Sequence, residues 1–97
     1  MKTLEKLQKG NYIAFGFNYN GGEPNEVIIN NITEVYKDSV LVHFIYNGYK
    51  SLSEIIKKKD ILAIRDEKHG TEEIKGWTGK YIILNSKKLN KILNEKS

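Results

Sequence analysis

Few residues of this chain have the type and spacing that catalysis or metal binding requires. His43 lies within an apolar segment, and the second histidine, His69, lies in a charged stretch 26 positions later. A metal or catalytic site needs further groups of matched type close by, whereas a strand histidine needs only one hydrogen bond. We therefore predict a structural role for His43.

The densest group of possible metal ligands lies between residues 66 and 73. Carboxylate oxygens at this density suit a hard cation such as Mg²⁺ or Ca²⁺. The spacing, however, lacks the alternating acidic residues and the central glycine of a calcium-binding loop. We predict a solvated loop and no metal for this group, which comprises Asp66, Glu67, His69, Glu72 and Glu73.

Motifs for nucleophilic catalysis and phosphate binding are missing from the sequence. The absence of cysteine excludes disulfides and thiolate sites. No serine occurs in the G-x-S-x-G arrangement of a strained nucleophile. The glycine-rich run at residues 20–22 lacks the lysine and the following helix of a phosphate-binding loop. We expect a protein that is not an enzyme and carries no cofactor.

Aromatic side chains form the first group suited to binding. They gather at predicted strand ends and beside loops, and tyrosine and tryptophan are enriched at protein interfaces because they bury much area at little entropic cost. The alternative for each is a ring that covers the core while its polar group contacts water. The sequence leaves both open for the candidate protein-binding residues, which are Tyr19, Tyr49 and Trp77.

Lysines form the second group. The 97-residue chain has 16 basic and 12 acidic residues, and Arg65 is its one arginine. Lysines neutralise phosphates but do not read guanine edges as arginine does, so binding would be weakly sequence-specific. If the two terminal helices lie side by side, their lysine faces form one cationic strip. The candidate nucleic-acid-binding residues are Lys57, Lys58, Lys59, Lys87, Lys88 and Lys91.

Amino-acid usage offers a simpler explanation for the lysines. Lysine, isoleucine, asparagine and tyrosine have A/T-rich codons and dominate the sequence, as expected from a low-GC bacterium. Small cysteine-free proteins of this composition are common in phages and mobile elements. On this association we expect the protein to come from a phage or a mobile element. The sequence begins with no apolar leader and has no run that spans a membrane. We therefore expect a cytoplasmic protein.

Short strands must position these candidates. Alternating apolar residues predict strands at 11–19, 26–36, 40–46 and 60–65, and a fifth strand or a hairpin within 71–83. Residues 40–46 are apolar on both faces, which predicts a central strand buried on both sides. Within 26–36 the apolar parity changes near Asn30-Asn31. This change predicts a strand that bends from one sheet into another.

Three short helical segments are predicted around the strands. Thr3 caps a segment that ends at Gly10. Ser51 and Glu54 have the spacing of a capping box, which predicts a helical turn before the fourth strand. Asn85 or Ser86 begins a final helix. The apolar stripe of that helix is Leu89, Ile92 and Leu93.

The order of these elements resembles the SH3-like small barrel. The resemblance covers residues 10–65 and rests on the strand opening at 10–13, the central hairpin at 32–42 and the residues that close the helical turn at 59–62. It implies a small five-stranded barrel, and the short peripheral N- and C-terminal helices are not part of that layout. We therefore predict one mainly β (α+β) domain in which the barrel core spans 10–65, a loop and the last strand span 66–84, and the C-terminal helix spans 85–97.

A barrel of this kind usually binds other molecules. Aromatic residues near its first loop and strand ends line grooves for extended peptides or bases. We therefore expect a non-enzymatic protein–protein interaction module, an inhibitor or an accessory factor, with an unidentified protein partner and no membrane partner. Nucleic-acid binding through the lysines is the alternative. Self-association into a homodimer through an exposed edge strand is a third possibility.

Overall fold

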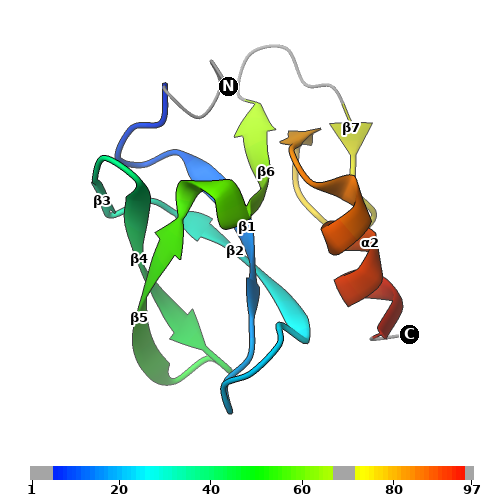
Figure 1. Ribbon diagram of the computed structural model, residues 1–97, viewed down its shortest axis with the longest axis horizontal. Helices are drawn as coiled ribbons and strands as arrows, with labels where there is room; N and C mark the ends of the chain where they lie inside the picture. The colour runs from blue at the N-terminus through cyan, green and yellow to red at the C-terminus, as the bar shows by residue number, and fades with distance from the viewer. Residues whose placement is uncertain (1–5, 67–71, 96–97) are drawn as a thin grey trace.

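Two antiparallel sheets and one helix form the computed structural model, which describes residues 6–66 and 72–95 (Figure 1). The larger sheet has the order β2-β1-β6-β8-β7 and the smaller sheet the order β3-β4-β5. This arrangement confirms the predicted mainly β class. The strands are β1 Tyr12–Phe17, β2 Glu26–Asn31, β3 Glu34–Val35, β4 Ser39–Tyr46, β5 Lys50–Lys57, β6 Ile61–Asp66, β7 Glu72–Glu73 and β8 Lys80–Ile83; the 3-10 turn η1 is Lys58–Asp60 and the helix α2 is Ser86–Glu95.

The centre of the larger sheet, formed by β1 and β6, is buried on both faces. Its inner face packs against the smaller sheet through large side chains of β1, among them Ile13 and Phe15. Its outer face carries the small residue Ala14 and lies against α2, where Leu89 and Ile92 are buried. Alternation of large and small residues along β1 therefore serves two layers, one on each side of the sheet.

The predicted change of sheet after the first half of the second strand is confirmed. β2 belongs to the larger sheet and β3 to the smaller one. The crossing lies at Ile32 and Thr33. The Ile32 N–H donates to the Asn11 carbonyl at 2.9 Å, whereas the Thr33 N–H donates to the Leu41 carbonyl of β4 at 2.8 Å. Within the described ranges the two sheets do not close into a barrel.

The helical turn predicted at Ser51–Glu54 is wrong, because these residues belong to β5. The tight turn before them has Asn47 at φ 53° and Gly48 at φ 80°, the positive values that favour a hairpin. β5 then pairs with β4 over its whole length. This pairing also places Ile56 in the core. The ladder with β4 therefore stabilises residues 51–54 more than a local helix cap would. The helical turn occurs later, as η1.

The third predicted strand is central, since β4 lies between β3 and β5. Burial on both of its faces is wrong, however. Val42 and Phe44 are buried, whereas His43 and Ile45 are exposed. His43 donates its backbone N–H to the Thr33 hydroxyl, and its Nδ1 contacts the Ser53 hydroxyl. Hydrophobic residue types did not reveal which face of the smaller sheet lacks a covering layer.

Two of the predicted helices lie at the ends of the chain. The Asn85 side-chain oxygen accepts the Lys88 N–H at 3.1 Å, which confirms the start of the C-terminal helix. The predicted N-terminal helix begins at Thr3, outside the described residues, and residues 6–10 form turns with Leu7 buried. No helix in residues 6–66 and 72–95 has the length and apolarity needed to cross a membrane.

The region after β6 contains the predicted hairpin, formed by β7 and β8. Part of the charged loop before it, residues 67–71, lies outside the described residues. Glu67 and His69 of the predicted acidic group are therefore not located. The described residues hold no group of three or more metal-ligating side chains placed to bind an ion.

Gly16 on the outer side of β1 allows the 18–25 loop to fold back onto the sheet. A Cβ at this position would lie 2.7 Å from the Pro24 Cβ and 3.1 Å from the Ile92 Cδ1. A side chain here would collide with both the loop and α2. The close approach that the small residues of β1 predict is therefore present, and the loop and helix meet at Gly16.

We expect Gly16→Ala to destabilise the fold by about 1–3 kcal/mol, because the added methyl overpacks a tight contact. Urea unfolding of the wild type and the variant measures the loss. A matched background, Pro24→Gly, removes the nearest contact atoms. In that background Gly16→Ala should cost less, and an equal cost in both backgrounds would contradict the steric explanation.

Candidate functional site

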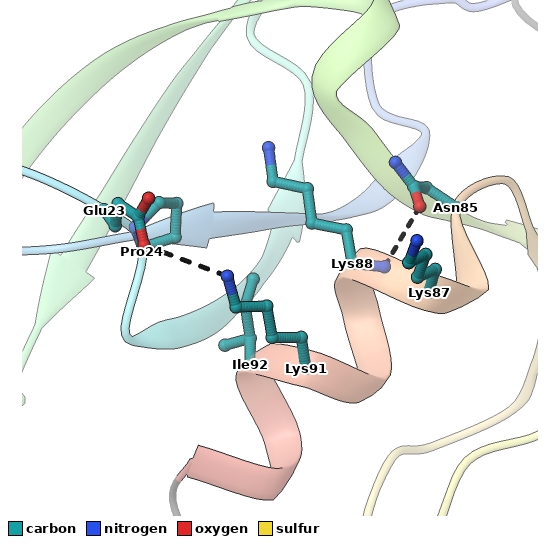
Figure 2. A pocket seen from close by; sticks show the side chains of 7 residues that line it. All are labelled: Glu23, Pro24, Asn85, Lys87, Lys88, Lys91 and Ile92. Carbon is teal, nitrogen blue, oxygen red and sulfur yellow. Dashed lines mark hydrogen bonds and ion pairs between the residues drawn. The ribbon is translucent and has the colours of Figure 1, made fainter.

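A groove lies between the 18–25 loop and α2 (Figure 2). Its volume is ≈ 420 Å³. A second hollow of ≈ 330 Å³ shares Pro24 and Lys88 with the first and extends to β5 and η1. The two hollows are therefore neighbours along Pro24 and Lys88, and together they are here named the lysine groove. Its lining on the helix side is Glu23, Pro24, Asn85, Lys87, Lys88, Lys91 and Ile92.

The lysine groove unites two lysine clusters that lie 30 positions apart in the sequence. Lys57 and Lys59 line its β5 end, and three lysines of α2 line the other end. Lys58, the remaining candidate, lies half-buried in η1 and is not part of the lining. The sequence suggested instead that the α2 lysines meet an N-terminal cluster. There, Lys9 pairs with Glu34 at 2.9 Å, and residues 1–5 lie outside the described residues.

The rim of the groove is cationic but not uniformly so. Five lysines and three carboxylates, those of Glu23, Glu54 and Asp60, line it. Figure 2 shows Lys91 extending from α2 toward Glu23, with 4.0 Å between the Lys91 Nζ and the Glu23 Oε2. Both side chains are largely exposed, so this ion pair contributes little to stability and leaves Lys91 able to change partner.

The floor of the groove is apolar. Pro24 and Ile92 form it beside α2, and Phe15 and Ile56 form it beside β5. Pro24 is half-buried and supplies the accessible part of this floor, whereas Ile92, Phe15 and Ile56 are at most 7% exposed. Ile55, with 60% of its surface exposed, stands at the β5 end. An apolar floor beneath a lysine-rich rim can take an aliphatic side chain and hold negative charge on either side of it.

The three candidate aromatic residues do not form one surface. Tyr19 stacks on Tyr46 with ring centroids 5.2 Å apart, and Lys50 lies over the Tyr19 ring and donates to its hydroxyl. Tyr49 is 73% exposed in the turn between β4 and β5. Trp77, in contrast, is partly buried and packs edge-on against Tyr81, beside the core cluster that includes Leu89 and Ile92 of α2.

Sequence reasoning missed two residues that shape these sites. Pro24 is the one proline of the chain and forms the floor shared by both hollows. Its position in a glycine-rich loop indicated a turn but not a contact with Gly16. Tyr46 holds Tyr19 in place by stacking and donates its hydroxyl to the Glu26 Oε2 at 2.6 Å. Its partners lie 20 or more positions away, so no local pattern reveals them.

Comparison of this chain with protein-family models, with curated proteins and with solved structures finds no match. The function must therefore be argued from the lysine groove and the exposed surfaces themselves.

The Tyr46 hydroxyl provides a pH-dependent test of the aromatic cluster. Its hydrogen bond to Glu26 raises the pKa of Tyr46 above the ordinary 10.0, and desolvation and the Glu26 charge act in the same direction. The folded protein therefore keeps this proton at a pH where the unfolded chain has lost it. We expect the stabilisation to be complete below pH 10.0 and to decline as the pH rises through the raised pKa.

The matched variants are Glu26→Ala, which removes the acceptor, and Glu23→Ala, which removes a nearby carboxylate that does not contact Tyr46. Tyrosine ¹³C chemical shifts against pH give the pKa of Tyr46 in each. It should fall toward the ordinary value in Glu26→Ala alone. An equal pKa in all three proteins would show that the bond to Glu26 is not its cause.

Proposed function

We propose that this protein is a non-enzymatic protein–protein interaction module whose lysine groove holds an extended acidic segment of a partner protein. The observation that carries the proposal is the apolar floor beneath the lysine rim. By binding and covering such a segment, the module acts as an inhibitor of its partner or as an accessory factor to it.

Each part of the groove has a role in this proposal. Pro24, which is half-buried, receives an apolar side chain of the partner, and the burial of that contact supplies affinity. Lys88 belongs to both hollows, so it can pair with a carboxylate next to that anchor. Lys57 and Lys87 extend the positive rim in opposite directions. Charge complementarity of this kind accelerates association and selects acidic partners.

The SH3-like barrel is the architecture that we propose for this module. The order of strands, the bent segment shared by β2 and β3, and η1 before β6 support it. The second hollow is lined by Gly16 of β1 and residues 54–57 of β5, which belong to different sheets. On this proposal the groove occupies the open side of an incompletely closed barrel.

We expect Lys88→Glu to abolish capture of the partner, because it places a negative charge at the centre of the groove. Affinity capture from a low-GC bacterial lysate, followed by cross-linking and mass spectrometry, measures this. The matched control is Lys37→Glu, an exposed lysine outside the groove lining. Wild type and control should retain one protein, cross-linked through an acidic segment, and Lys88→Glu should retain at least about tenfold less.

Capture that is equal in Lys88→Glu and wild type would overturn the proposal. Cross-links from the captured protein that map to residues away from the groove would do the same.

Nucleic-acid binding remains the second candidate because five of the six predicted lysines line one groove. Proteins that bind single strands also stack bases on aromatic rings. The aromatic residue in the groove lining, Phe15, is only 1% exposed and offers no ring face. A phosphate backbone would also leave the apolar floor unused. These two features place nucleic acid second.

The salt dependence of affinity decides whether this second candidate holds. If it does, fluorescence anisotropy should detect binding of DNA at low salt. Lys57→Ala and Lys88→Ala should each flatten the slope of log affinity against log salt by about 0.9 on duplex and about 0.7 on single strands. Lys37→Ala should leave the slope unchanged. No binding at low salt would remove nucleic acid as a candidate.

A further inference from the structure

We infer that β5 is the pairing edge of a two-fold symmetric homodimer, in which it lies antiparallel to β5 of a second copy. On one side β5 pairs with β4, and no strand of the described ranges pairs with its other side. It has eight residues, whereas the other edge strands are shorter: β2 has six, and β3 and β7 have two each. A long open edge of this kind is a template for another strand.

The backbone groups that face the open side of β5 follow from its register. Lys58 donates its N–H to the Asp38 carbonyl at 2.9 Å, one step beyond the pair of Ser39 and Lys57. In an antiparallel ladder, residues alternate between the two neighbouring sides. Even-numbered residues of β5 therefore bond to β4. The N–H and C=O groups of Ser51, Ser53 and Ile55 point to the open side.

The side chains of β5 are self-complementary when two copies run antiparallel. Lys50, Leu52 and Glu54 follow one another on the same face of the strand. With Leu52 on the two-fold axis, Lys50 of each copy lies opposite the partner's Glu54. The pairing thus forms two opposite-charge pairs around one apolar pair. Cross-strand pairs of both kinds stabilise sheets.

The opposite face of the strand agrees with the same register. Ser51 lies opposite the partner's Ser53, and serine pairs form cross-strand hydrogen bonds. Ile55, 60% exposed, lies near the partner's Tyr49, and Tyr49 of the chain is itself 73% exposed. Association would therefore cover two of the most exposed apolar side chains among the described residues.

Neighbouring registers lack this complementarity. With Ser53 on the axis, Leu52 lies opposite the partner's Glu54 and Lys50 opposite the partner's Ile56. With Glu54 on the axis, two carboxylates face each other. Like charges directly opposite destabilise a sheet. The charge pattern therefore selects one register. It also selects a second copy of this chain as the occupant, because the pattern of β5 is complementary to itself.

Charge reversal tests the register. We expect wild type to dimerise in sedimentation velocity, and Lys50→Glu and Glu54→Lys, each alone, to weaken dimerisation at least about tenfold. A 1:1 mixture of the two variants should form a heterodimer, because the glutamate introduced in one chain then faces the lysine introduced in the other. Circular dichroism confirms that each variant is folded.

A backbone variant tests the edge itself. Ser53→Pro removes an N–H that points away from β4, a position where edge strands tolerate proline, and should abolish the dimer. Ser53→Ala, the matched control, loses only the serine pair, keeps the N–H and should still dimerise. A monomeric wild type at all concentrations would overturn the inference. So would single charge variants that dimerise like wild type, or a mixture that stays monomeric; binding of an unrelated strand peptide in place of the copy would overturn the choice of occupant.

Discussion

The two-sided packing of β1 is the constraint on which the rest of the structure depends. Its large residues fill the space between the sheets, and its small residues leave room on the outer face. Because Gly16 has no side chain, Pro24 and Ile92 approach the sheet closely. This contact fixes the 18–25 loop beside α2, and the lysine groove is the space left along that junction.

The elements predicted correctly from sequence are those with local causes. The parity change after Asn30 predicted the crossing between sheets, and Asn85 predicted the start of α2, because the sequence pattern that indicates each lies within a few positions. The segment 51–54 failed for the opposite reason. Its serine and glutamate favour a cap locally, whereas β4 supplies a complete ladder from a distance. Non-local pairing determined the outcome.

The candidate site likewise depends on contacts between distant parts of the sequence. The sequence suggested that the α2 lysines lie beside the N-terminal ones, whereas in the structure they line the same groove as Lys57 and Lys59, because of where α2 lies against the larger sheet. The aromatic candidates lie in different surroundings and do not form one surface. Tyr49 projects from a turn, whereas Trp77 is partly buried and lies against Tyr81. Side-chain type indicates what a residue can bind, but the packing of distant elements decides which residues act together.

The crossing at Ile32 and Thr33 has a consequence for how the chain folds. One continuous segment supplies a strand to each sheet, so placing β2 in the larger sheet also brings β3 to the edge of the smaller one. Intermediates with a single finished sheet are therefore disfavoured, and the sheets should gain and lose order cooperatively. Since β1 must also find β6 across about 50 residues, the folding rate is limited by distant contacts and not by local turns.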